Sequence, residues 1–454
     1  MKNITRLIIE KLKSYAGLQS IFTTPVRWVI PFRNAANKKK DKLNLEDFNV
    51  PVTGICMIEP ALLDFKGHYY NFANCVGRAS SDRDYKFKVL LSEDCISEIQ
   101  KAIPSLAVFS KLPNNYLRRG LIIKHLFAPI VFNWSFFKGL NKETVNFLGP
   151  NWLVYMSTTQ DLHLLAIWAW MRRFKSNKAP ILILTFRLSL YRSDLNRWSP
   201  SVIWYLLGLR LLKSLAKKYR IHLVTDSARL VDEFQRLTKL PIHIVPIPHL
   251  DLIKSDSKLS SRSNSILRMV SLGSARMPKG FDILSSAIQI LHSRGELDNI
   301  KFDLHCYQTI DDEIITSSVS LLKDINHQNI TLIDRVIDES EYYKMLADAD
   351  IVLIPYLQHI YLSNTSGVFT EAIAAGKPVI VTEGTWMSEK LKSFGAGLTC
   401  RDRDPEDLAR IICEARDNYF ELKSKADAGR EKWVTYNNPE NFFNELLKIS
   451  GIHH

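Results

Sequence analysis

Residues 350–384 read DIVLIPYLQHIYLSNTSGVFTEAIAAGKPVIVTEG, and this stretch predicts a strand, a loop, a helix and a second strand. The short apolar runs at 351–354 and 378–381 are typical of strands that are buried on both faces of a parallel sheet. Between them, residues 370–375 predict a short helix that ends at Gly376, a residue that readily adopts the left-handed C-cap conformation. The stretch therefore predicts part of a parallel sheet with helices between its strands.

The loop SNTSGV at residues 363–368 leads directly into this helix, whose first N–H groups have no partner within the helix. Such an end carries roughly half a positive charge and suits a phosphate. Gly367 allows a ligand to approach the backbone, and Thr365 or Ser366 can cap the helix or donate a hydroxyl. Glu371, one turn later, is placed to bind a ribose, so the pair indicates a nucleotide. The alternative is a well-capped turn in which Glu371 only complements the helix dipole.

A second loop of the same kind lies upstream, within LRMVSLGSARMPKGFDILSSAIQIL at residues 267–291. An apolar run followed by apolar residues at helical spacing predicts a strand and a helix that enclose a loop bounded by Gly273 and Gly280. Arg276 and Lys279 stand in this loop, where a bidentate fork and a point charge can neutralise a diphosphate. Alone these cations would be ordinary solvated charges, but two phosphate-suited loops in one sheet favour a binding site.

Both loops resemble those of the retaining GT-B glycosyltransferases of family 4, the group 1 transferases. The family has a Gly-x-x-x-x-x-Lys-Gly loop, to which residues 273–280 are similar. It also has a later Glu-Ala-x-Ala-x-Gly-x-Pro-Val helix and strand, to which residues 371–381 are similar. There are two departures, because Ser363 stands where the first glutamate of the family's pair is expected and Ser274 replaces an arginine. The first departure bears on recognition of the donor sugar and on activity.

The resemblance implies a site for a nucleotide-sugar donor. Arg276 and Lys279 would hold its diphosphate, Glu371 its ribose hydroxyls, and backbone groups near Ile337 its base. The other implied contacts come from the two loops and are Gly273, Thr365, Ser366, Gly367 and Val368. The departing charge would be stabilised by cations and the helix end instead of a metal ion, so neither a metal nor another cofactor is expected.

The same resemblance implies an α/β protein with the GT-B fold, in which two Rossmann-like domains with parallel sheets face a central cleft and a C-terminal helix crosses back. It implies transfer of a sugar to an acceptor hydroxyl with retention of anomeric configuration, in polysaccharide or glycoconjugate synthesis. A non-catalytic GT-B module that binds a nucleotide or a partner is one alternative. A sugar-nucleotide epimerase is another.

The chain length and composition agree with this organisation. The 454 residues are too many for one core and suit two domains. Residues 246–262 are rich in Ser and Lys and predict a linker. The predicted boundaries are a basic extension at 1–48, a first domain at 49–250, a linker at 251–265, a second domain at 266–435 and a returning helix at 436–454.

Charge is concentrated near the start of the chain. Of the net charge of +13, residues 1–44 contribute +8, with ten Lys or Arg against Glu10 and Asp41. Apolar residues at helical spacing within this segment suggest contact with an anionic membrane surface, the alternatives being a disordered tail or a helix packed on the first domain. Residues 118–138 are a second aromatic and basic stretch, for which a buried helix or a loop is favoured. No nucleic-acid motif accompanies the charge, so nucleic acid is not an expected partner.

No apolar run reaches the roughly 18 residues of a spanning helix and no signal peptide is legible, so the expected location is cytoplasmic, with the membrane contact peripheral. The six cysteines are scattered, which argues against a zinc site or a disulfide framework. The Asp-x-Asp spellings at 348–350 and 402–404 fall at a strand start and in a polar loop, and neither is expected to bind a metal.

Polar residues follow several predicted strands of the first domain, where ligands of parallel sheets bind. His68, at the entrance to the first helix, and His163, near the start of a later helix, are the two candidates for contact with the transferred sugar. Arg187 also follows a strand. Asp226 or Ser227 is expected to cap the next helix, which is a structural role.

Overall fold

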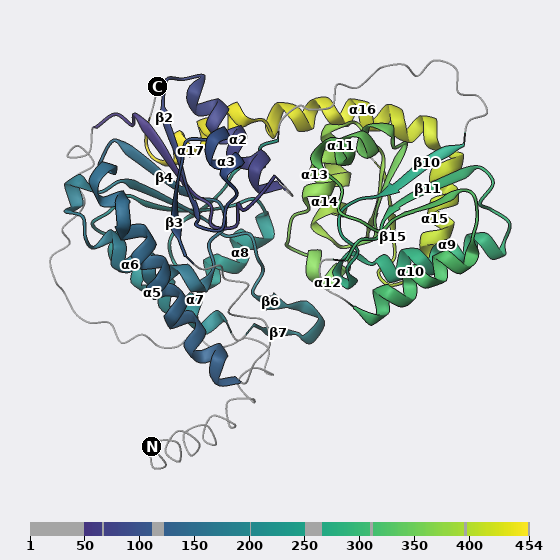
Figure 1. The fold of residues 1–454 in the computed structure, drawn as a ribbon, viewed down its shortest axis with the longest axis horizontal. Coiled ribbons are helices and arrows are strands. Elements are labelled where there is room, and N and C mark those ends of the chain that lie inside the picture. Colours follow the sequence, from purple (N-terminus) through teal and green to yellow (C-terminus); the bar gives the residue numbers. More distant parts are fainter. Residues whose placement is uncertain are drawn as a thin grey trace, which may run out of the picture.

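The computed structural model describes residues 50–65, 68–110, 122–199, 201–249, 266–308, 312–394 and 397–452. These residues form two α/β domains, each built around a parallel sheet (Figure 1). The predicted basic extension at 1–48 and the linker at 251–265 lie outside the described residues. Among the helices that the structure describes, none is long and apolar enough to span a membrane.

The first domain has a seven-stranded parallel sheet in the order β3-β2-β1-β4-β5-β8-β9. Its central strands are buried on both faces, as their continuous apolar sequences require. Strand β2 pairs with one side of β1 and β4 with the other side. The strand order therefore reverses between β1 and β4, which flank the topological switch point. The strands are β1 (Gly54–Ile58), β2 (Lys86–Ser92), β3 (Ser105–Phe109), β4 (Trp152–Met156), β5 (Ile181–Thr185), β8 (Ile221–Thr225) and β9 (Ile242–Ile244).

Helices cover both faces of this sheet, and each face has its own apolar core. One face carries α2 (His68–Ser81) and α3 (Ser97–Ala102). The other carries α5 (Ile122–Phe147), α6 (Asp161–Met171), α7 (Val202–Leu215) and α8 (Ala228–Leu237). Short elements complete the domain: 3-10 turns at Ser176–Lys178 and Ser193–Leu195, and a hairpin of β6 (Tyr191–Arg192) and β7 (Arg197–Trp198).

The second domain has a six-stranded parallel sheet in the order β12-β11-β10-β13-β14-β15. The strands are β10 (Leu267–Ser271), β11 (Ile300–His305), β12 (Ile330–Ile333), β13 (Ile351–Ile354), β14 (Val379–Thr382) and β15 (Gly397–Cys400). The helices are a 3-10 turn at Met277–Lys279, then α9 (Phe281–Ser293), α10 (Glu313–Ile325), α11 (Glu339–Asp348), α12 (Gln358–Tyr361), α13 (Gly367–Ala374), α14 (Trp386–Phe394) and α15 (Pro405–Asp417). Strands β10 and β13 are direct neighbours, so the loops at their carboxyl ends meet at one edge.

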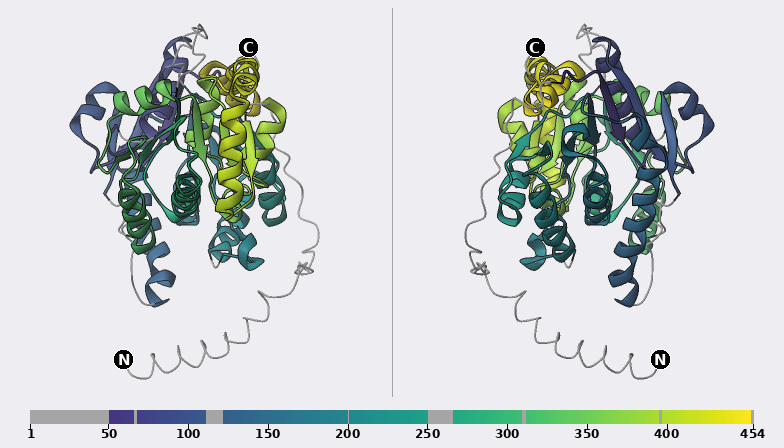
Figure 2. Two further views of the ribbon diagram at one scale, coloured as in Figure 1. Left: turned by 90° about the vertical axis from the view of Figure 1, so that its right-hand side faces the viewer. Right: turned by 90° about the vertical axis from the view of Figure 1, so that its left-hand side faces the viewer.

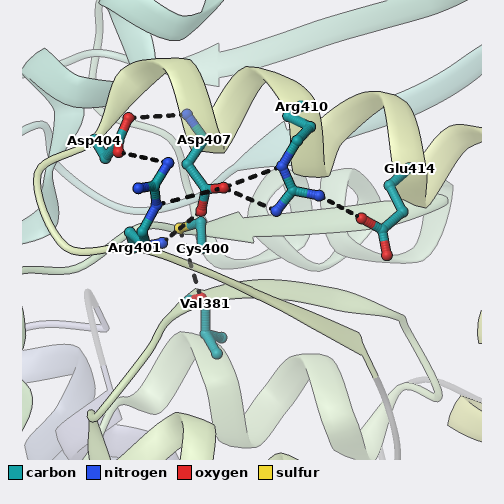
Figure 3. A network of polar contacts seen from close by, with 7 residues as sticks. All are labelled: Val381, Cys400, Arg401, Asp404, Asp407, Arg410 and Glu414. Carbon is teal, nitrogen blue, oxygen red and sulfur yellow. Dashed lines mark hydrogen bonds and ion pairs between the residues drawn. The ribbon is translucent and has the colours of Figure 1, made fainter.

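A polar network fixes α15 to the end of β15 (Figure 3). Asp404 is the N-cap of α15 and accepts a hydrogen bond from the Asp407 backbone at 2.9 Å. The Asp407 carboxylate in turn accepts from the Arg401 backbone at 2.8 Å and from the Arg410 guanidinium. The second Asp-x-Asp spelling thus contains a helix cap, a structural use for one of its carboxylates.

The last two helices connect the domains. Helix α16 (Tyr419–Tyr436) runs along the top of the second domain toward the first, and α17 (Pro439–Ile449) packs against α2 (Figure 1). Phe442 and Phe443 of α17 are fully buried in the first-domain core, where Phe442 contacts Phe72 edge-on with ring centroids 5.5 Å apart. The chain therefore returns to the domain from which it started.

Candidate functional site

The loop after β10 is built around the side chain of Lys279. Gly273 has φ +80°, and a Cβ atom at this position would lie 2.4 Å from Lys279 Nζ, so glycine leaves the space that the ammonium occupies. The Lys279 ammonium donates to the Leu272 carbonyl at 3.4 Å. Gly280 follows with φ +64°, and its Cβ would lie 2.0 Å from the Pro355 carbonyl oxygen. The two glycines thus hold Lys279 against the end of β13.

The loop after β13 leads into an open helix end. Ser366 is the N-cap of α13, and its hydroxyl accepts a hydrogen bond from the Phe369 amide at 3.3 Å. Gly367, the first residue of α13, is exposed, and nothing lies within 4 Å of the position that its Cβ would take. The first amides of α13, at Gly367 and Val368, are therefore accessible to an anion.

Charged and phenolic side chains link the two loops. The pKa of Lys279 is lowered to about 7, first by burial and then by Arg276, while Glu371 opposes the shift. Burial raises the pKa of Glu371 to about 7, although the hydrogen bond from Tyr342 acts to lower it. The Tyr342 hydroxyl donates to Glu371 Oε2 at 2.5 Å, and Lys279 Nζ lies 5.7 Å from the centroid of the Tyr356 ring. Cation, carboxylate and helix end thus form one cluster.

A second polar cluster lies at the carboxyl ends of β1, β4, β5 and β8 in the first domain. Glu59 is buried and accepts a hydrogen bond from Ser157. Burial raises the pKa of Glu59 to about 7. Arg187 Nε lies 3.4 Å from Asp226 Oδ2, and its guanidinium lies 4.8 Å from the centroid of the Phe72 ring. These charges stand at the edge of the sheet where ligands of parallel sheets bind.

Hydrogen bonds join the two domains directly. The Thr365 hydroxyl donates to Asp226 Oδ2 at 3.2 Å, and the Ser189 amide donates to Asn364 Oδ1 at 3.0 Å. A further contact joins α2 to α11, where Asn71 Nδ2 donates to the Tyr343 hydroxyl at 2.9 Å. The segment that leads into α13 is therefore in direct contact with the polar cluster of the first domain.

The expectation that Asp226 or Ser227 caps α8 is wrong. Ser227 stands at the N-cap position, but its side chain accepts no hydrogen bond there. Asp226 directs its carboxylate to Arg187 and Thr365 instead, because the strand end faces the second domain. The residue assigned a structural role therefore lies at the contact between the two domains.

The two candidate histidines differ in what the structure describes. His163 is buried in the α5–α6 interface, where its ring centroid lies 5.4 Å from that of Phe132 and 4.7 Å from that of Phe136. Its Nδ1 accepts a hydrogen bond from the Gln160 amide at 3.0 Å, and burial lowers its pKa to about 3. This packing favours a structural role. His68 begins α2, and its side chain lies outside the described part.

The remaining expected residues lie around the second-domain loops. Ile337 is buried directly before Asp338, the N-cap of α11, and Val368 is partly buried in the first turn of α13. Sequence reasoning missed Tyr342 and Tyr343, which come from α11. A tyrosine pair in an amphipathic helix gives no signal of its own, since such residues are usually core. In the described ranges, no group of three His, Cys, Asp or Glu side chains is arranged to hold a metal ion.

Comparisons with known proteins agree with this architecture. Residues 267–418 match the family model described as glycosyl transferases group 1. Sucrose-phosphate synthase from Thermosynechococcus elongatus is 14% identical with a TM-score of 0.62, covering 87% of this chain and 98% of that chain. Anabaena HepE, solved with UDP and glucose, is 13% identical with a TM-score of 0.58, covering 87% and 98%.

WaaG, described as a glycosyltransferase involved in lipopolysaccharide biosynthesis, is 16% identical with a TM-score of 0.56, covering 87% of this chain and 100% of that chain. The search among curated proteins finds no match. The chain therefore has the GT-B fold, and most of its second domain matches the group 1 transferases.

Proposed function

From a GT-B fold whose second domain matches the group 1 transferases, we propose that the chain moves a sugar from a nucleotide-sugar donor to an acceptor hydroxyl with retention of configuration. The observation that carries the proposal is the cluster of Lys279, Arg276 and Glu371 beside the open end of α13. This arrangement offers positive charge for a diphosphate and a carboxylate for a ribose. Synthesis of a cell-surface polysaccharide or glycoconjugate is the proposed setting.

In this proposal, the residues act on the departing diphosphate. As the anomeric bond breaks, negative charge grows on the leaving phosphate, and Lys279, Arg276 and the amides of Gly367 and Val368 stabilise it. The leaving phosphate takes the proton of the acceptor hydroxyl, so no strong protein base is required. Glu371 holds the ribose, and the backbone near Ile337 faces the base. Catalysis proceeds with these side chains and amides in place of a metal ion.

The first-domain cluster of Glu59, Arg187 and Asp226 faces this donor site and is proposed to contact the acceptor or the transferred sugar. Its contact with Thr365 places it next to the loop that leads to the α13 amides. A polyol can donate hydroxyl groups to its carboxylates and accept from Arg187. His68 stays a proposal for the same region.

Assays across a panel of sugar nucleotides test the proposed function, with UDP-glucose tried first because HepE was solved with UDP and glucose. Consumption of a donor with formation of a glycosylated acceptor is the expected result. Binding without consumption would instead identify a non-catalytic module. A new sugar nucleotide formed with no acceptor present would identify an epimerase.

Donor affinity should depend on pH through Lys279. Its pKa is about 7 without ligand, because burial and Arg276 disfavour the charged form, whereas a bound diphosphate favours that form. Above pH 7 the free protein must take up a proton to bind, so the dissociation constant should rise about tenfold per pH unit. Titration calorimetry of wild type and Lys279→Arg checks this. An equally steep dependence in the arginine variant would assign the effect to another group, such as Glu371.

Peripheral binding to an anionic membrane is proposed for residues 1–44, whose net charge is +8. Flotation with vesicles that contain phosphatidylglycerol should recover less protein when these residues are removed. Equal recovery of both forms would contradict this part of the proposal.

A further inference from the structure

The helices on one face of the first sheet expose several large apolar side chains. Trp134 of α5 and Ile203 of α7 each expose 59% of their surface, and Ile130 of α5 exposes 50%. Leu206 and Leu207, one turn after Ile203 on α7, are also exposed. Their spacing of three and four residues gives α7 an apolar stripe that points away from the core.

Helix α6 lies between α5 and α7 and is apolar on every side. Its inner side chains are buried, while Leu165 and Trp168 on the outer side are only partly covered. A helix that is apolar all round normally has neighbours on all sides. The outer side of α6 therefore indicates that something covers this layer.

Helices α5, α6 and α7 pack side by side, so their exposed side chains lie on the same outer layer. The Ala166 amide of α6 donates to Asn133 Oδ1 of α5 at 2.8 Å, directly beside Trp134 in the sequence. On the other side, a Cβ atom at Gly208 of α7 would lie 2.4 Å from Leu164 Cβ of α6. We call this surface the α5–α7 face and define it by Ile130, Trp134, Trp168, Ile203, Leu206 and Leu207.

The α5–α7 face lies in the most basic folded part of the chain. Residues 122–218 hold 14 Lys or Arg against Glu143, Asp161 and Asp194, a net charge of +11 within a chain whose total is +13. Two cations border the apolar side chains directly. Lys138 Nζ lies 5.3 Å from the centroid of the Trp134 ring, and the Arg172 guanidinium lies 4.7 Å from that of Trp168.

We propose that the α5–α7 face binds the surface of an anionic lipid bilayer. Tryptophan and aliphatic side chains bordered by cations are the composition of interfacial membrane contacts, because the apolar groups enter the acyl boundary while the cations meet the headgroups. A second copy of this chain is a poorer occupant, since dimerisation through this face would bring together two segments that each carry a net charge of +11. Figure 2 shows one end of α5 reaching beyond the neighbouring helices.

The position of the face connects it to the cleft. Helices α5, α6 and α7 follow β3, β4 and β5, so all three begin at the carboxyl edge of the sheet, where Glu59 and Arg187 lie. A protein bound through this face holds that edge near the lipid headgroups. Binding of the α5–α7 face to a membrane does not depend on the proposed function. Only its consequence, that an acceptor held in the membrane would reach the site between the domains, rests on that function.

The test is vesicle flotation of the full chain and of Trp134→Gln/Ile203→Ser. Both side chains are largely exposed, so the double variant should fold, and residues 1–44 are present in every sample. The matched control is Ile314→Ser/Phe420→Ser, which removes two apolar side chains of the second domain that are 52% and 59% exposed. With phosphatidylglycerol in phosphatidylcholine vesicles, the partition constant should fall about tenfold or more for the first variant and stay near wild type for the control.

Three results would overturn the proposal. One is recovery of Trp134→Gln/Ile203→Ser equal to that of wild type, and another is an equal loss in the control. The third is a wild-type dimer in light scattering that this variant converts to a monomer, which would assign the face to a second copy. UDP-glucose turnover with a soluble acceptor is measured in parallel, because its failure bears on the proposed function and leaves the flotation result unaffected.

Discussion

Lys279→Ala should reduce sugar transfer by about 10²–10³-fold in kcat, because the leaving diphosphate loses a fixed positive charge in the transition state. The variant should not lose stability. The Lys279 ammonium is held with its pKa lowered to about 7, which means that the fold disfavours its charge, so truncation removes a cost along with the contact. Steady-state kinetics and thermal unfolding on the same preparation check both statements.

Lys344→Ala is the matched control for this variant, since Lys344 is an exposed lysine on α11 of the same domain. Its kinetics should be those of wild type. Lys279→Arg should restore part of the rate, because the charge returns in a bulkier form next to Gly273. Wild-type turnover in Lys279→Ala would remove this residue from the mechanism.

Glu371→Ala should lower kcat/KM by about 10- to 100-fold, as expected when a charged hydrogen-bonding partner of the donor is lost. The carboxylate is aligned by the Tyr342 hydroxyl, so Tyr342→Phe should show a smaller loss of the same kind. Burial raises the Glu371 pKa to about 7, and the native state therefore does not depend on its charge for stability. Donor titration and kinetics provide the measurement.

Glu313→Ala is the control here, because Glu313 is an exposed carboxylate in the first turn of α10. A change in donor KM in Glu371→Ala with an unchanged value in the control supports ribose binding. If Glu371→Ala lost activity only through unfolding, the carboxylate would be structural and the ribose contact would be wrong.

Much of the fold was predictable because buried parallel strands have continuous apolar sequences. The expected strands at 351–354 and 378–381 correspond to β13 and β14. Strands β3 and β15 were missed, and both are edge strands with polar or small residues. Helix α12 was also missed, since a four-residue helix within a loop is too short to show a period.

The convergence of the two second-domain loops could be predicted because the carboxyl ends of neighbouring parallel strands share an edge. The contacts of Glu371 with Tyr342, and of Asp226 with Thr365, could not, because each joins residues far apart in sequence. His163 shows a further limit. Its position after a strand suggested the cleft, but the local sequence does not reveal that Phe132 and Phe136 enclose its ring.

The stretch at 118–138 shows a related limit. Its aromatic and basic residues favoured a buried helix or a loop, and α5, which begins at Ile122, buries Phe132 and Phe136 but exposes Trp134. The helical period shows which residues share a side of α5, but which side is buried becomes clear only once α6 is placed beside it. The α5–α7 face therefore follows from packing and not from composition alone.

A crystal structure of the chain bound to UDP would decide where the donor binds. We expect the diphosphate between the Lys279 ammonium and the amides of Gly367 and Val368, at hydrogen-bond distance from both sides, with the ribose on Glu371. A diphosphate bound away from these two loops, or contacting only one of them, would show that the proposed donor site is wrong.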